Sequence, residues 1–273
     1  MFAKLVKHEF RATRRIIPFI YLATAMMIMV NLLVREMAAD WLSNALMALL
    51  FVLGVSEVLM TYVVVFFRYY KNLYNSEGYL MNTLPVPPRL LLTSKILVSF
   101  VWLALSYLLM AGVVLTTILT ITGESQSGLA LGQLIELFIA GSGLARSSFF
   151  AVAGLSLLYL ILSTLYLMSQ VFFAISLGNV SRLQSMGIGA PILIYLGIYL
   201  ICQLLGLGLM LLVPVGLTIE NGVLHLVFES MLATLKNPDR PVIGLGILLL
   251  IIGATIGFFA GCARLLKKNV SLR

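Results

Sequence analysis

Six long apolar stretches dominate this sequence, and they restrict what the chain can fold into more than any other feature does. Each has at least 19 residues; they cover residues 16–34, 42–67, 96–122, 149–177, 188–217 and 242–263. About 20 apolar residues in a helix cross the roughly 30 Å hydrocarbon core of a bilayer. The sequence therefore predicts six transmembrane helices. Several stretches exceed 25 residues, so we expect tilt or a break near Pro191 or Pro214.

The composition excludes an ordinary water-soluble enzyme. Of the 273 residues, 61% are apolar and 10% are charged, whereas soluble domains have about 45–50% apolar and about 25% charged residues. The connections between the six stretches are too short for a separate soluble domain. We expect one transmembrane domain over residues 1–273, all-α and polytopic, in a multi-pass membrane protein.

The positive charges divide unevenly between the two sides of this predicted arrangement. Only four of the 18 Lys and Arg residues fall on the side of the first connection, namely Arg35, Arg146, Lys236 and Arg240. The other 14 fall on the side of the termini, and positive residues near span ends are retained in the cytoplasm. This division predicts that both termini are cytoplasmic. It also accounts for the net charge of +8 without nucleic-acid binding.

Residues 1–15 have the pattern of an amphipathic helix at the membrane surface. Phe2, Leu5, Val6 and Phe10 recur at helical spacing, and the other positions carry the polar residues Lys4, Lys7, His8, Arg11, Arg14 and Arg15. A charge cluster that only sets orientation would not need this order. The pattern therefore favours an interfacial helix, with His8 on its polar face and not as a ligand.

The connection over residues 68–95 is the largest predicted cytoplasmic segment. It contains the apolar run Tyr79-Leu80-Met81 and the stiffening residues Pro85, Pro87 and Pro88. A passive linker is polar and flexible, so this composition favours a compact surface for a cytoplasmic partner. The alternative is that the apolar run dips into the bilayer interface, a zone that aromatic residues favour.

Two segments on the predicted outer side, residues 123–148 and 218–241, contain apolar stretches too short to span. We expect both to form interfacial or re-entrant helices. In the second, His225 and Glu229 have helical i, i+4 spacing. Two such residues without a third are weak evidence of a metal site, so a surface polar pair is the better interpretation.

The sequence contains no phosphate loop, no HExxH or GxSxG motif and no Cys/His cluster with metal-ligand spacing. We therefore expect no catalytic residues, no bound metal or cofactor and no enzymatic activity of its own. Any energy for transport would come from a partner or an ion gradient.

Glu57 lies near the middle of the second apolar stretch. Placing a comparable charge there costs about 2.5–3.5 kcal/mol on insertion scales, so its side chain should face the bundle interior or a wet cavity, or be neutral. One hypothesis is proton coupling. The other, which we favour, is a structural Glu that is hydrogen-bonded to Ser, Thr or Tyr of a neighbouring helix, or that contacts substrate.

The last apolar stretch has a repeat of small residues, Gly253, Gly257 and Gly261. This spacing lets another helix approach closely. Packing within the chain is the favoured interpretation over a contact between two copies.

These features together resemble the membrane subunits of bacterial ATP-binding-cassette exporters of the type-2 permease class. The topology of the whole chain is similar, and residues 67–95 carry the most specific likeness, in FRYYKNLYNSEGYLMNTLPVPPRLLLTSK. Within it, Glu77-Gly78-Tyr79-Leu80-Met81 followed by Thr83-Leu84-Pro85-Val86 looks like a segment that recurs in small permeases of this class.

The resemblance implies a place in the bacterial cell membrane and a partner that hydrolyses ATP. Residues 75–85 would be a coupling helix seated on a separate ATPase subunit, formed by Asn75, Ser76, Glu77, Gly78, Tyr79, Leu80, Met81, Thr83, Leu84 and Pro85. The N-terminal helix would lie beside it. Two permease subunits, identical or related, would pair with two ATPases that bind ATP and Mg²⁺, and residues 128–140 and 218–239 would form the outer gate. The substrate moved outward would be amphipathic or resemble a peptide, antibiotic or lipid.

Two other functions are compatible with the residues. One is an ion-gradient carrier or channel that uses Glu57. The other is a membrane adaptor that binds partners in a sensing or immunity complex and moves no solute.

Overall fold

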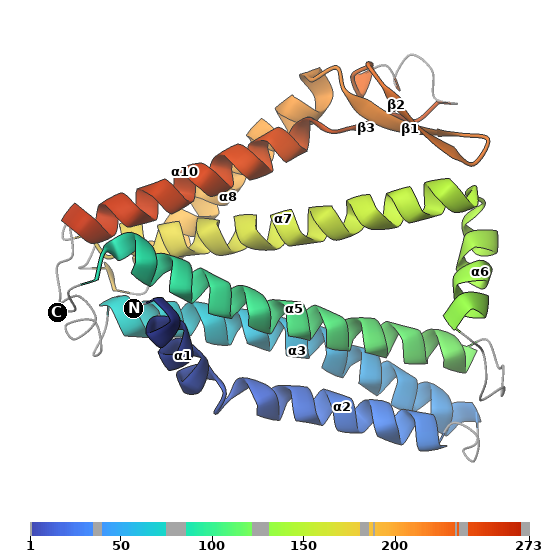
Figure 1. Cartoon of the computed structure of the whole chain (residues 1–273), viewed down its shortest axis with the longest axis horizontal. Coiled ribbons are helices and arrows are strands. Elements are labelled where there is room, and N and C mark those ends of the chain that lie inside the picture. The colour runs from blue at the N-terminus through green and yellow to red at the C-terminus, as the bar shows by residue number, and fades with distance from the viewer. Residues whose placement is uncertain are drawn as a thin grey trace. The chain divides into compact units, whose positions relative to one another are not determined.

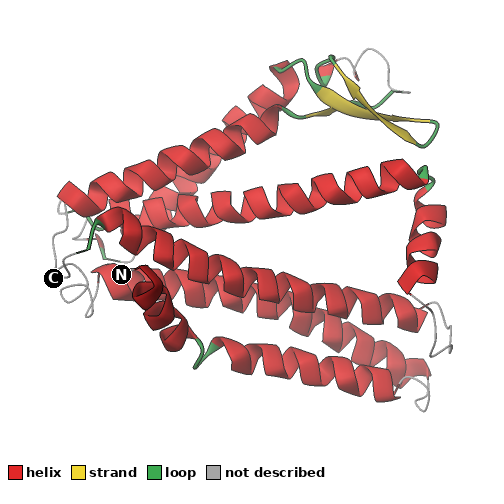
Figure 2. Ribbon diagram, viewed as in Figure 1, coloured by secondary structure: helices red, strands yellow, loops and turns green. Residues whose placement is uncertain are grey.

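The computed structural model describes residues 2–34, 40–74, 86–121, 131–180, 186–187, 189–232, 234 and 240–268. Eight helices and a small three-stranded sheet are present among these residues. Their labels are given in Figure 1 and their secondary structure in Figure 2. Six of the described helices are long and apolar enough to cross a membrane. The predicted helical polytopic fold is confirmed.

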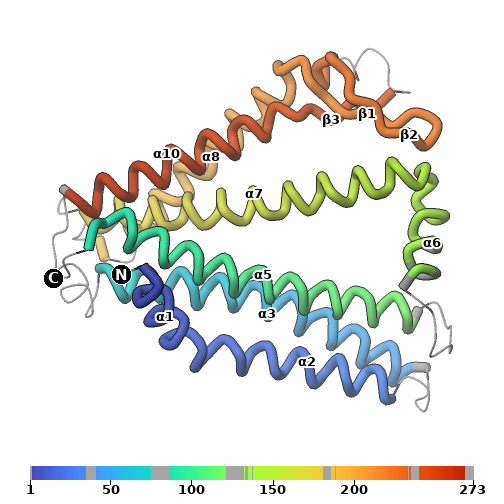
Figure 3. Tube along the Cα trace, in the orientation of Figure 1, coloured from blue at the N-terminus to red at the C-terminus, as the bar shows by residue number. Residues whose placement is uncertain are grey.

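The chain divides into two compact units, Met1–Ser127 with the last two residues, and Gly128–Ser271. The first unit contains α1 (Phe2–Thr13), α2 (Ile17–Val34), α3 (Asp40–Tyr74) and α5 (Pro88–Ile121). Figure 3 follows the chain through these helices. α2 packs against α3 and α5, and α1 packs against α5.

α3 and α5 are longer than a bilayer core requires. The 35 residues of α3 extend about 52 Å at 1.5 Å per residue, against a hydrocarbon thickness of about 30 Å. Both helices extend past the predicted apolar stretches. α3 continues after the stretch at 42–67, from Arg68 to Tyr74. α5 begins before the stretch at 96–122, and this earlier part covers Pro88 to Lys95. These extensions bring polar side chains of the two helices to one end of the first unit.

The second unit contains α6 (Leu131–Ser142), α7 (Arg146–Gly178), α8 (Gly189–Leu212) and α10 (Gly246–Lys268), with three strands between α8 and α10. α7 packs against α8 and α10, and these two also contact each other. Phe258 of α10 stacks on Phe173 of α7 with ring centroids 5.3 Å apart. The helix expected within residues 123–148 is present as α6.

The two prolines of the fifth span have different outcomes. Pro191 is in the first turn of α8, where the missing N–H costs nothing. α8 ends at Leu212, two residues before Pro214, so that span is shorter than predicted.

The helix predicted within residues 218–241 is wrong for residues 218–227, whereas Leu232 and Thr234 are helical. Residues Gly216–Glu220 (β1) and Val223–Val227 (β2) pair antiparallel as a hairpin, and β1 also pairs with Ile243–Gly244 (β3). The turn residues Asn221 and Gly222 both have positive φ, 51° and 77°, as the favoured two-residue hairpin turn requires. His225 lies on β2 opposite Thr218, so the helical pairing of His225 with Glu229 is also wrong.

The hairpin is attached to the start of α7. The backbone N–H of Ala145 donates to the Gly222 carbonyl at 2.8 Å, and the N–H of Leu224 donates to Ser148 Oγ at 3.1 Å. Ser148 and Thr218 are buried. The hairpin is therefore held against α7 of the second unit.

Candidate functional site

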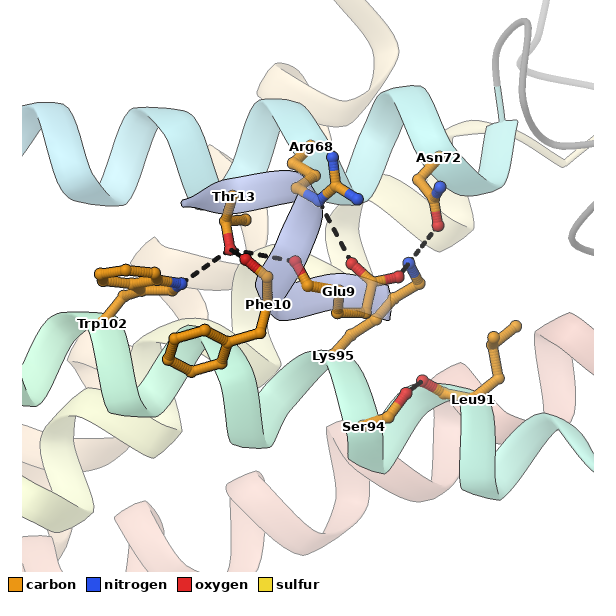
Figure 4. Close-up of polar contacts among 9 residues, drawn as sticks. All are labelled: Glu9, Phe10, Thr13, Arg68, Asn72, Leu91, Ser94, Lys95 and Trp102. Carbon is orange, nitrogen blue, oxygen red and sulfur yellow. Dashed lines mark hydrogen bonds and ion pairs between the residues drawn. The ribbon is translucent and has the colours of Figure 1, made fainter. Parts of the chain in front are cut away.

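A cluster of buried charged and polar side chains connects α1 to the ends of α3 and α5. Glu9 Oε1 lies 2.5 Å from Lys95 Nζ, and Glu9 Oε2 lies 3.2 Å from Arg68 Nε. Lys95 Nζ also donates to Asn72 Oδ1. Figure 4 shows the Glu9 carboxylate between the Arg68 and Lys95 side chains. One carboxylate thus joins three helices; we call Glu9, Arg68, Asn72 and Lys95 the Glu9 cluster.

The Glu9 cluster is shielded from solvent. Glu9 and Lys95 are each 4% exposed and Asn72 is 2% exposed, whereas the Arg68 side chain is 22% exposed. Burial on its own raises the pKa of Glu9, but the nearby positive charges of Lys95 and Arg68 outweigh it and lower the pKa below its ordinary value. Glu9 is therefore ionised at neutral pH and bound to two cations.

An aromatic contact holds α1 one turn further along. Trp102 Nε1 donates to Thr13 Oγ1 at 2.8 Å, and Thr13 Oγ1 donates to the Glu9 carbonyl at 3.0 Å. The Phe10 ring stacks on Trp102 with centroids 4.8 Å apart, as Figure 4 shows in part. Tyr21 of α2 donates from its hydroxyl to the Trp102 carbonyl at 2.6 Å. α1 is therefore docked on α5 by both polar and aromatic contacts.

The predicted two faces of the N-terminal helix are present, with an addition. Lys4, Arg11, Arg14 and Arg15 are exposed, as are Lys7 and His8. The opposite face carries Val6 and Phe10, which pack against the Ile17, Val98 and Trp102 cluster; Leu5 is half-buried and Phe2 is 37% exposed. The addition is Glu9, a buried acidic residue to which the sequence analysis assigned no role.

A signal for Glu9 was present in the sequence. Residues 6, 9, 10 and 13 share one helical face, so Glu9 and Thr13 are the two polar residues on the face that carries Val6 and Phe10. An acidic residue on an apolar face requires a partner when that face is buried. The sequence could have identified Glu9, but not the partners that it finds 59 and 86 residues away.

All ten residues predicted for the coupling role lie outside the described residues. They are Asn75 to Met81 and Thr83 to Pro85. The structure does describe the two helices that flank them, α3 to Tyr74 and α5 from Pro88. The coupling role of the ten loop residues stays a prediction.

Glu57 lies in the interior of the first unit. Its residue is 2% exposed, and neither carboxylate oxygen has a hydrogen-bond partner among the described residues. The hydroxyl of Ser106 on α5 lies beside it, outside hydrogen-bonding geometry, and Tyr21 of α2 is close enough to interact electrostatically. The side chain thus faces neighbouring helices of its own unit, among hydroxyl groups.

The three glycines of the last span differ in their surroundings. A Cβ at Gly261 would lie 2.6 Å from Phe173 Cε2, so this glycine allows α10 to approach α7 closely. At Gly253 and Gly257, a Cβ would meet no described atom within 4 Å. Close packing within the second unit therefore accounts for Gly261 alone.

In the part of the chain that the structure describes, no three Asp, Glu, His or Cys residues form a group that could hold a metal ion. Neither Cys202 nor Cys262 is in a disulfide, and the Ser176 hydroxyl donates to Cys262 Sγ.

No protein-family model, curated protein or solved structure matches this chain. The functional assignment therefore depends on the residues and the geometry of the chain itself.

Proposed function

We propose that this chain is the membrane subunit of an ATP-driven exporter in the bacterial cell membrane, working as one of a pair of permease subunits with two separate ATPases. In this proposal residues 75–85 receive the motion of an ATPase that binds ATP and Mg²⁺. The permease pair moves an amphipathic or peptide-, antibiotic- or lipid-like substrate outward. Both termini and the loop lie on the cytoplasmic side.

The observation that supports this proposal best is the position of the Glu9 cluster. Arg68 and Asn72 lie within about two turns of the end of α3, and Lys95 within about two turns of the start of α5. The segment at 75–85 therefore connects α3 to α5, and the Glu9 carboxylate binds both of these helices. A displacement of the loop would move α3, α5 and α1 together.

Such a connection suits force transmission. Salt bridges and hydrogen bonds between buried groups have defined geometry and hold helix ends in register, whereas a flexible linker absorbs displacement. A subunit that responds to ATP binding elsewhere needs a rigid path from its contact surface to its membrane helices. The long extensions of α3 and α5 beyond the bilayer core provide such a path.

The test is purification of the tagged full-length chain from its native membrane in mild detergent, with identification of bound subunits and measurement of ATP hydrolysis. We expect an ATPase subunit with a phosphate loop to be recovered. Changing Tyr79, Leu80 and Met81 together to Ser should remove that subunit and the ATP hydrolysis while leaving the chain in the membrane. The matched control changes Lys4, Lys7 and Arg11 to Gln, which are exposed on α1. If the loop variant retains the ATPase as fully as the wild-type chain does, the coupling role is wrong.

A second candidate function is an ion-gradient carrier, which the buried Glu57 carboxylate favours because its oxygens have no hydrogen-bond partner among the described residues. A proton carrier needs such a group in the membrane. The discriminating experiment is the isolated chain in liposomes that contain a pH-sensitive dye, under an applied potassium diffusion potential. Proton flux that is lost in Glu57→Gln would support the carrier. Absence of flux together with a recovered ATPase supports the exporter.

A further inference from the structure

A groove lies where α1, the turn before α2 and α3 meet. It has a volume of about 170 Å³, and it is lined by Ala12, Thr13, Ile16, Val64, Phe67, Arg68 and Lys71. A water molecule occupies roughly 30 Å³, so the groove accommodates a polar group considerably larger than water. All of its lining residues belong to the first unit.

The lining changes from apolar to cationic along α3. Val64 and Phe67 come first and Arg68 and Lys71 follow, so one helical face passes from hydrocarbon-like side chains to positive charge within about two turns. Phe67 is 61% exposed and Ile16 is 53% exposed. Exposed apolar side chains next to the cationic end of a membrane helix mark the boundary between acyl chains and headgroups.

Positive charge surrounds the groove. Arg11 and Arg15 are exposed and directly precede the lining residues Ala12 and Ile16 in sequence. Glu9 offsets part of this charge by binding Arg68. Lys71 is an exposed cation in the lining of the groove. A negatively charged group with an apolar chain attached matches both properties of the lining.

We propose that this groove is a binding site for one anionic phospholipid. The lipid phosphate would lie beside Lys71 and the exposed edge of Arg68, and the first carbons of an acyl chain would lie on Phe67, Val64 and Ile16. The basic face of α1 raises the local concentration of anionic lipid, because each Lys or Arg near a membrane surface contributes about 1 kcal/mol of attraction. The lipid would fill the angle between α1 and α3 next to the Glu9 cluster. This proposal does not depend on an ATPase partner.

The experiment measures lipid retention by the full-length chain in nanodiscs made from phosphatidylcholine with added phosphatidylglycerol. Native mass spectrometry after detergent release counts the lipids that stay bound. We expect the wild-type chain to retain phosphatidylglycerol in preference to phosphatidylcholine. Lys71→Gln should lower this retention about fivefold, which is the equivalent of 1 kcal/mol. The matched control is Arg89→Gln, which removes an exposed positive charge at the same end of the first unit, outside the groove.

A third variant changes the shape of the groove but not its charge. Ala12→Phe places a ring among the lining residues and should also lower phosphatidylglycerol retention. Trp102 fluorescence, which reports on α1 docking, is measured first in each variant. Excess glycerol phosphate should not displace the lipid, since the acyl contacts are part of the site.

Three results would overturn the proposal. Equal losses in Lys71→Gln and Arg89→Gln would indicate diffuse surface charge instead of a groove. If Lys71→Gln retains as much phosphatidylglycerol as the wild-type chain does, Lys71 does not contact the lipid phosphate. If glycerol phosphate displaces bound phosphatidylglycerol as effectively as added phosphatidylglycerol does, the groove binds a free phosphate group and not a phospholipid.

Discussion

Replacing Glu9 by Gln should release α1 from the first unit. The change removes the negative charge that Lys95 and Arg68 bind, and it leaves Lys95, 4% exposed, as a buried cation. Removing one partner of a buried ion pair costs about 3–5 kcal/mol. Asn72 still accepts from Lys95, and the Gln oxygen can accept too, so we expect the lower end. About 3 kcal/mol is a shift of roughly a hundredfold in the docking equilibrium.

Trp102 provides the assay, because it stacks on Phe10 and donates to Thr13 of α1. The chain has two tryptophans, so Trp41→Phe leaves Trp102 as the only indole. We expect Glu9→Gln to shift the Trp102 emission to the red and to increase quenching by acrylamide. Hydrogen exchange of α1 should rise in parallel.

Two companion variants make the assay decisive. Arg11→Gln removes a charge from the exposed face of α1 and should leave the Trp102 emission unchanged. Lys95→Met in the Glu9→Gln background removes the orphaned cation and should restore most of the docking, since replacing both partners of a buried pair by groups of similar shape is often near neutral. Unchanged emission in Glu9→Gln, or weaker docking in the double variant than in the single one, would refute the reasoning.

Three further predictions concern the pH dependence of docking, two glycines of α10 and one glycine of the hairpin turn. The pKa of Glu9 is lowered in the folded chain by Lys95 and Arg68, the charged groups that face it, against the effect of burial. The contribution of Glu9 to docking is therefore complete above the ordinary carboxyl pKa of about 4.3 and is lost progressively as the pH falls from there through the lower folded pKa. Trp102 emission should be constant from neutral pH down to about 4.3 and shift to the red as the pH falls further. A transition near pH 6 instead would contradict this. Gly261→Ala should lower the free energy of unfolding by about 1–3 kcal/mol, because the new methyl group meets the Phe173 ring. Gly257→Ala should change this free energy by less than about 0.5 kcal/mol. Equal effects of the two substitutions would refute the packing difference. Gly222→Ala places a side chain at φ 77° and 2.7 Å from the Gly143 carbonyl oxygen, so hydrogen exchange in residues 216–227 should become faster, and unchanged protection would show that the turn is not strained.

The six spans could be predicted because their signal is local. An apolar run of sufficient length is enough to identify a membrane helix, whatever it packs against. The same local reasoning placed the end of α3 too early and the start of α5 too late, since Arg68 to Tyr74 and Pro88 to Lys95 are helical but not apolar throughout. Hydropathy detects where a helix is in lipid and does not detect where the helix ends.

The sequence contains a turn signal for the hairpin at 216–227, but the apolar stretch that follows the turn favours a helix. The apolar stretch within residues 218–241 favours a short helix, but Asn221-Gly222 stands between two runs rich in Leu, Ile and Val. Asn-Gly between such runs is the strongest short-range sign of a two-residue hairpin turn. The two positive φ angles at Asn221 and Gly222 show that this turn decides the local fold.

The Glu9 cluster could be predicted only in part. The position of Glu9 on the apolar face of the N-terminal helix is a property of the sequence. Its pairing with Lys95, 86 residues away, depends on how α1 crosses α5, which is set by the packing of Phe10 and Trp102. A single sequence contains no local signal for that crossing.

Site-specific crosslinking from the 75–85 segment tests the proposed function most directly. A photo-reactive phenylalanine analogue at Met81, with the same analogue at Phe67 as the control, is introduced into the full-length chain in its native membrane and irradiated. The account predicts that Met81 crosslinks to a subunit that carries a phosphate loop, with a yield that changes when ATP is added, and that Phe67, which is exposed on a membrane-spanning helix, crosslinks to lipid. Crosslinks from Met81 only to lipid or to the chain itself, whether or not ATP is present, would contradict it.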